Sequence, residues 1–243
     1  MNRIKTYGIP KEIQKNEKYT VMVRPVGEEL WSSVECYNVK VDMHEVRDAA
    51  MTYFDFEGEV EVAVSLNENF VDIYRADIRP LSKNIKPQID GKTLNFRLSE
   101  PANLSIEING DRFHNLHLFA GKIEEYTYDK ENAVIMSQHF GDTESLPSGG
   151  TVVFEPGVYY IEEVVSKIPS DTNVLIKGGA VIVGGFVCEN TQNIRIYGRG
   201  VIFQGNQEWY TSLNGVRISN CRNIEIDGVA FIDPPHYTVF IGG

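Results

Sequence analysis

A short frame that recurs in the second half of the chain constrains the fold most strongly. Asn193–Gly198 reads N-I-R-I-Y-G, and Asn223–Gly228 reads N-I-E-I-D-G thirty positions later. Asn173–Gly178 (N-V-L-I-K-G) begins twenty positions before the first of these, and Thr151–Gly157 is a looser relative. Each copy joins an asparagine, a short strand with alternating aliphatic residues, and a glycine. A strand-and-turn unit of this period is typical of a parallel β-solenoid, in which each copy forms one side of a coil.

Alternation within the frame assigns a direction to each side chain. We expect Leu175, Arg195 and Glu225 to point outward, and the glycine to occupy a corner with positive φ or close backbone approach. The asparagine has two open interpretations: a ladder of amides that bond from coil to coil, or a turn residue in each coil. The residues expected to point inward and stack on the next coil are Val174, Ile176, Ile194, Ile196, Ile224 and Ile226.

The first half of the chain has a different pattern, that of short antiparallel strands. Val60–Leu66 alternates apolar and polar residues, and Leu104–Ile108 does the same. Turn signals such as Asp90-Gly91 and Asn109-Gly110 separate these segments. About seven short strands at roughly ten-residue spacing predict a β-sandwich.

The predicted organisation is all-β. Residues 20–120 form the antiparallel β-sandwich, residues 121–150 the connector, and residues 151–243 the first coils of a parallel β-helix, truncated at its C-terminal end. Residues 1–18 are polar and predict a tail, or an arm that lies on a neighbour. A short helical turn is predicted within Ile161–Ile168, ahead of a proline.

Composition excludes several function classes. A formal net charge of −11 and the lack of a Lys/Arg cluster argue against nucleic acid. No segment approaches the roughly 18 apolar residues of a membrane span. The N-terminal sequence contains no secretory leader, which predicts a cytoplasmic protein, or a secreted one if a leader was trimmed.

The candidate metal ligands have simpler explanations. Cys36, Cys188 and Cys221 are far apart and odd in number, so we expect buried thiols in a reducing compartment. Asp42 and His44 alternate along a predicted strand and indicate a solvated face. We expect neither a metal nor a cofactor.

Several segments resemble the polygalacturonase-type glycoside hydrolases, the right-handed parallel β-helix pectinases of glycoside hydrolase family 28. Thr151–Tyr159, Gly178–Gly185 and Ile196–Gly200 resemble the family's opening coils. Asn220–Val229 and Ile232–Val239 resemble the coil just before its catalytic coils. A β-sandwich ahead of the helix also resembles dextranase and isopullulanase-type enzymes.

The resemblance implies inverting hydrolysis of O-glycosidic bonds in a polysaccharide, such as one of the plant cell wall. In this chemistry one carboxylic acid protonates the leaving oxygen, and opposed carboxylates about 6.5–9.5 Å away activate water. The family's Asn-Thr-Asp, Asp-Asp, Gly-His-Gly and Arg-Ile-Lys signatures are absent from this sequence. No catalytic residue carries over, and we expect a polypeptide of this sequence alone to lack glycosidase activity.

Three residues are candidates for contact with a polysaccharide or oligosaccharide. Trp209 and Tyr210 lie in the excursion that lengthens one repeat interval from twenty to thirty residues, and excursions often wall the groove of a solenoid. In the resembled family, the edge that carries His236 borders the cleft. Asp227 precedes a corner glycine and Asp233 precedes Pro-Pro, so turn formation explains both without a catalytic role.

Two alternatives come from other classes: a non-catalytic carbohydrate-binding or structural β-solenoid module, and a polysaccharide lyase, which needs a cluster of acids for Ca²⁺. Asp-rich coils encoded after Gly243 would favour the hydrolase, and a stop codon there would favour the module. An uncapped last coil also predicts self-association, because it exposes backbone groups and an apolar cross-section.

Overall fold

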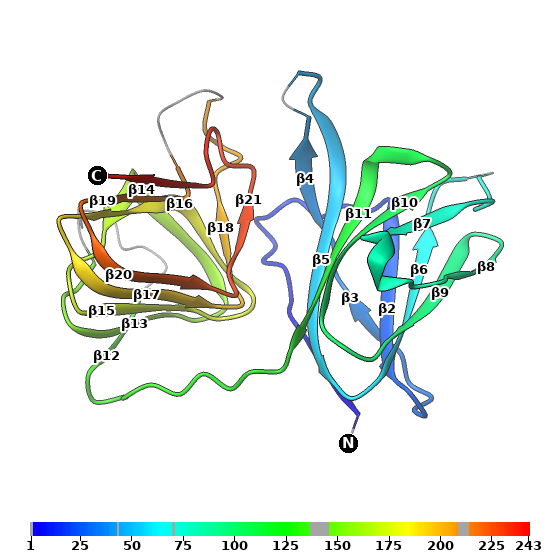
Figure 1. The fold of residues 1–243 in the computed structure, drawn as a ribbon, viewed down its shortest axis with the longest axis horizontal. Coiled ribbons are helices and arrows are strands. Elements are labelled where there is room, and N and C mark those ends of the chain that lie inside the picture. The colour runs from blue at the N-terminus through cyan, green and yellow to red at the C-terminus, as the bar shows by residue number, and fades with distance from the viewer. Residues whose placement is uncertain (1, 43, 70, 137–145, 209–213) are drawn as a thin grey trace. The chain divides into compact units, whose positions relative to one another are not determined.

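The computed structural model is nearly all-β and divides into two compact units (Figure 1). We call Met1–Glu125 the sandwich unit and Tyr126–Gly243 the β-helix unit and describe each by itself. No helix in the described part of the chain is long and apolar enough to cross a membrane. The structure describes residues 2–42, 44–69, 71–136, 146–208 and 214–243.

Two sheets make up the sandwich unit. The first has the order β1-β5-β11-β10-β7, with β4 also paired to β5. Its strands are β1 (Arg3–Thr6), β4 (Tyr37–Val41), β5 (Arg47–Glu57), β7 (Ala76–Arg79), β10 (Ala102–Ile108) and β11 (Asp111–Lys122). The second has the order β3-β2-β6-β9-β8. Its strands are β2 (Tyr19–Pro25), β3 (Ser32–Val34), β6 (Val60–Leu66), β8 (Gln88–Asp90) and β9 (Thr93–Leu98), and the 3₁₀ turn η1 (Leu81–Lys83) precedes β8.

Period-2 alternation explains how the sheets pack. In β6, Val60, Val62 and Val64 are fully buried, whereas the residues between them are partly exposed on the other face. Side chains from both sheets form one apolar cluster, and each fully buried aliphatic contributes about 1.5–3 kcal/mol. One pairing differs from the predicted antiparallel pattern, since β5 and β11 run parallel. Such a pair joins strands far apart in sequence, and local turn signals do not reveal it.

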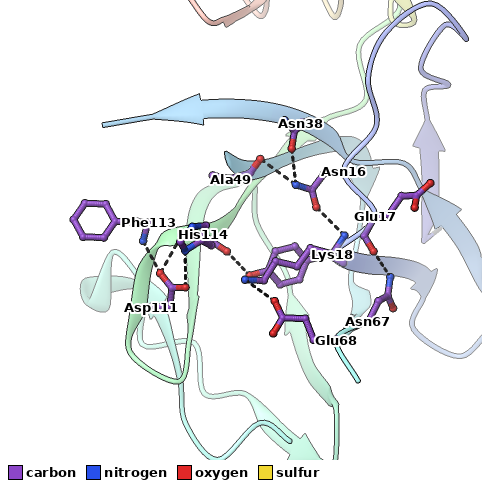
Figure 2. A network of polar contacts seen from close by, with 11 residues as sticks. Asn16, Glu17, Lys18, Asn38, Ala49, Asn67, Glu68, Asp111, Phe113 and His114 are labelled. Carbon is purple, nitrogen blue, oxygen red and sulfur yellow. Dashed lines mark hydrogen bonds and ion pairs between the residues drawn. The ribbon is translucent and has the colours of Figure 1, made fainter. Parts of the chain in front are cut away.

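The predicted N-terminal arm is wrong, because residues 3–6 form β1 and pair antiparallel with the end of β5. The segment before β2 is also fastened to the sandwich (Figure 2). The Asn16 amide donates to Asn38 Oδ1 at 2.9 Å and to the Ala49 carbonyl at 3.3 Å. The Asn67 amide donates to the Glu17 carbonyl at 2.7 Å. These bonds place residues up to 18 in the sandwich unit.

The β-helix unit consists of two parallel sheets. The first parallel sheet has the order β12-β13-β15-β17-β20. Its strands are β12 (Ala133–Ile135), β13 (Gly150–Phe154), β15 (Thr172–Ile176), β17 (Gln192–Gly198) and β20 (Arg222–Asp227). The second parallel sheet has the order β21-β18-β16-β19-β22, with β14 also paired to β16. Its strands are β14 (Gly157–Lys167), β16 (Ala180–Glu189), β18 (Val201–Phe203), β19 (Val216–Ser219), β21 (Ala230–Ile232) and β22 (Val239–Gly242). Residues 157–167 are therefore a strand, and the helical turn predicted within Ile161–Ile168 is wrong.

The inward positions of the repeat are as predicted, but the predicted equivalence of Asn173 with Asn193 is wrong by two residues. Val174 pairs with Ile196, and Ile196 pairs with Ile226 on the next coil. Asn173, however, pairs with Arg195 and not with Asn193. A shift of two residues leaves the same aliphatic residues pointing inward, so alternation alone does not detect it.

The true partner of Asn193 in the previous coil is Asp171. Asn193 Nδ2 donates to Asp171 Oδ1 at 2.8 Å, and Asn223 Nδ2 donates to Asn193 Oδ1 at 2.9 Å. The three residues have φ values of 58°, 54° and 54°, in the left-handed region. The two interpretations of the asparagine are thus both correct, because the same residues make the turn and the ladder.

The outward residue Leu175 is fully buried, although it points away from the coil interior. It forms a small cluster with Val153 and Tyr197, against which Tyr126 and Tyr128 pack. The start of the β-helix unit therefore covers part of the outer face of the first parallel sheet.

Candidate functional site

The candidate site is a corner in the middle of the second parallel sheet. β16 passes through this corner at Gly184-Gly185, pairing first with β18 through residues 181–183 and then with β19 through residues 186–189. On the next coil the corresponding strand is divided into β18 and β19, which residues 204–215 connect. On the coil after that it is divided into β21 and β22, which residues 233–238 connect. We call the two connecting segments, residues 204–215 and 233–238, the corner loops.

Backbone hydrogen bonds stack the corner loops coil upon coil. Gln204 N donates to the Ile232 carbonyl at 3.1 Å, and Val216 N donates to the Thr238 carbonyl at 3.1 Å. On the other side of the stack, the Gly215 carbonyl accepts from Phe186 N at 2.9 Å. A Cβ at Gly185 would lie 2.5 Å from the Asn214 carbonyl oxygen, so a side chain there would push the first corner loop away. The glycine permits the close approach.

Buried amides hold the base of the first corner loop. Gln204 is 1% exposed, and its Nε2 donates to the Asn214 carbonyl at 3.2 Å, which joins the two ends of the loop. Gln204 Oε1 has no hydrogen-bond partner among the described residues. A buried acceptor without a partner costs about 1–3 kcal/mol, and such groups are often found where a ligand or water binds.

Of the three predicted contact residues, the structure describes His236. It lies in the second corner loop, is exposed, and packs edge-on against Tyr237 with 4.2 Å between ring centroids. Tyr237 is 60% exposed. The two rings present an aromatic surface at the corner. Trp209 and Tyr210 belong to the first corner loop by sequence but lie outside the described residues.

The two aspartates lie on different sheets and do not form an acid pair. Asp227 ends β20 in the first parallel sheet, where its carboxylate is 3.7 Å from Arg195. Asp233 follows β21 with φ of 50°, which fits the predicted turn role. Its carboxylate nevertheless lies at the corner, 3.0 Å from where a Cβ on Gly205 would be.

Sequence reasoning missed Gln204 and Tyr237. The lengthened repeat interval indicated the first corner loop, but glutamine and tyrosine are common enough that neither stood out. Among the described residues, no group of three or more His, Cys, Asp or Glu side chains is arranged to hold a metal ion.

Comparisons with known proteins show the fold. No protein-family model and no curated protein matches the sequence. The structure is similar to that of Dex49A from Penicillium minioluteum, with a TM-score of 0.79 at 16% sequence identity. The match covers 98% of this chain and 57% of Dex49A, so the chain spans little more than half the length of that protein. The chain therefore has a β-sandwich and parallel β-helix fold of the kind found in a β-helix glycoside hydrolase.

Proposed function

We propose that this chain supplies the sandwich and the early coils of a polysaccharide-degrading glycoside hydrolase, and that its corner loops contact the sugar. The observation that carries the proposal is the stacking of two corner loops, with exposed His236 and Tyr237, on a fold similar to that of Dex49A. Dex49A is a dextranase with a right-handed β-helix. The sequence motifs favour a polygalacturonase-type enzyme that inverts configuration at a pectic polysaccharide.

The chemistry of the corner suits a sugar. The axial C–H groups of a pyranose ring pack on an aromatic face such as that of Tyr237. Asp233 and His236 add polar groups at the same corner. None of these residues is assigned a catalytic role here, since the family's carboxylate signatures do not occur in the chain.

Affinity electrophoresis tests the sugar contact. The 243-residue protein should be retarded in gels that contain polygalacturonate or dextran, and Tyr237→Ala should weaken retardation about fivefold, as expected for the loss of one stacking contact. Tyr74→Ala is the matched control, because Tyr74 is 78% exposed in the sandwich unit. Equal retardation of both variants, or none of the wild-type protein, would contradict the proposal.

A second experiment separates an enzyme from a binding module. The 243-residue protein should release no reducing sugar from either polymer. The reading frame beyond the codon for Gly243 should encode coils with paired acidic residues. Release of reducing sugar would show that catalytic carboxylates lie in this chain after all. A stop codon at that position would favour a non-catalytic carbohydrate-binding or structural β-solenoid.

A further inference from the structure

The sandwich unit has a polar hollow that the proposed function does not use. It has a volume of about 770 Å³ and lies over the outer face of β2, β6 and β9, next to the segment around η1. All of its lining residues belong to the sandwich unit, so the inference below is independent of the corner loops. We call it the Trp31 hollow. Its lining includes Arg24, Trp31, Glu61, Gln88, Asn95 and Arg97.

Three charged residues form the floor of the hollow. Arg24, Glu61 and Arg97 stand opposite one another in register on β2, β6 and β9. Arg24 Nε and Nη2 lie 2.7 and 2.6 Å from Glu61 Oε2. Arg97 Nη2 and Nε lie 2.6 and 3.1 Å from Glu61 Oε1. One carboxylate thus holds two guanidinium groups, and the trio carries a net positive charge.

Trp31 stands beside this trio. The guanidinium carbon of Arg24 lies 4.4 Å from the centre of the Trp31 ring, within cation–π range. Glu61 orients Arg24, and Arg24 orients the indole, so the ring is held in place before any ligand arrives. The ring remains partly exposed and lines the hollow. A fixed, partly exposed indole next to amide side chains is suited to a sugar ring.

The charge of the hollow is opposite to that of the chain. Its lining includes four cations, Arg24, Lys83, Lys86 and Arg97, and two carboxylates, Glu61 and Glu100, which leaves two positive charges. The whole chain has a formal net charge of −11. A local positive site on an acidic protein attracts anions, because a concave surface focuses the field of the charges that line it.

We propose that the Trp31 hollow binds an anionic saccharide without catalysis. A short uronate oligomer meets these features: one carboxylate accepts from the guanidinium of Arg97, whose side chain is 66% exposed despite its bond to Glu61. One of its rings packs on Trp31, and its hydroxyl groups reach the amides of Gln88 and Asn95. A neutral glucan would leave the excess positive charge unmatched, and a small inorganic anion would not use the indole.

Tryptophan fluorescence tests this proposal. The chain has two tryptophans, so Trp209→Phe leaves Trp31 as the sole indole reporter. Titration with trigalacturonate should give a saturable change, weakened by added salt because the attraction is electrostatic. Isomaltotriose and sodium acetate, at matched concentrations, should give none.

Variants separate the charge from the fold. On the same background, Arg97→Ala should weaken trigalacturonate binding about tenfold, and Arg97→Lys should restore part of it. Arg3→Ala is the matched control: it removes another cross-strand arginine, bonded to Glu57 at 2.8 Å on the other sheet, and should leave affinity unchanged. Equal binding of isomaltotriose, equal binding by Arg97→Ala, or an acetate response like that of the saccharide would overturn the proposal. If Arg97→Ala unfolds, as circular dichroism would show, the Arg97→Lys titration and the salt dependence decide it.

Discussion

Asn193 is the residue whose replacement best separates the two roles of the repeated asparagine. Its side chain donates to Asp171 at 2.8 Å and accepts from Asn223 at 2.9 Å. Its backbone has φ of 54°, a conformation that alanine adopts only at a cost. Asn193→Ala removes both bonds and adds backbone strain, whereas Asn193→Gly removes both bonds without strain.

The expected magnitudes follow from these two terms. The residues of the ladder are exposed, so each hydrogen bond contributes about 0.5 kcal/mol, the low end of the usual range. A left-handed alanine costs about 1–2 kcal/mol. Asn193→Ala should therefore lower the free energy of unfolding by about 2–3 kcal/mol. Asn193→Gly should lower it by about 1–2 kcal/mol, including the greater freedom of glycine in the unfolded chain.

Urea unfolding of single-tryptophan proteins provides the measurement. With Trp31→Phe in the background, Trp209 reports on the β-helix unit. Asn103 on β10 is the control, because it is exposed in an extended strand, where glycine should destabilise more than alanine does. Unfolding of the Asn103 variants is followed by the fluorescence of Trp31, with Trp209→Phe in the background. Equal destabilisation by Asn193→Gly and Asn193→Ala would contradict the proposed strain at Asn193, as would glycine and alanine ranking in the same order at Asn193 and Asn103.

Three further outcomes follow from the structure. The pKa of Glu61 is lowered, first by Arg97 and then by Arg24, so its stabilising effect is present above the ordinary carboxyl pKa and is lost as the pH falls through the lowered value. Glu61→Gln should therefore be destabilising at pH 7, and its effect should shrink as the pH falls through that lowered pKa, as measured by urea unfolding. Burial raises the pKa of Cys188 to about 12, so a thiol reagent at pH 8 should label the partly exposed Cys221 before Cys188. Peptide mapping measures the order, and faster labelling of Cys188 would contradict this prediction. The 243-residue protein should self-associate through β20, β21 and β22, three of the edge strands of its parallel sheets, and a monomer by light scattering at high concentration would refute this.

The sequence predicted those features that depend on local alternation. The inward aliphatics of the repeat, such as Ile196, are buried as expected, and the alternation in β6 placed its valines in the sandwich core. The burial of Leu175 beneath Tyr126 and Tyr128 could not be predicted in this way, because it depends on where a distant segment lies.

Register and pairing partners were harder to predict for a physical reason. The frame at Asn173 was two residues late because a shift of two keeps every side chain on its own face. The sequence did not predict β1, because this edge strand packs only one residue, Ile4, against the apolar cluster, and one residue makes no alternating pattern. The parallel pairing of β5 with β11 depends on the path of the whole chain.

The corner loops are the part of the coil where function can be added at least cost to the fold. The inward residues are fixed by stacking on neighbouring coils, and the ladder at Asp171, Asn193 and Asn223 fixes a second corner. At the candidate corner, by contrast, β16 passes without interruption while later coils lengthen, and the pairing of Val183 with Phe203 and of Phe186 with Val216 is kept. Insertions there change the surface and leave the sheets intact, so the surface residues of this corner can vary without disturbing the stacked coils.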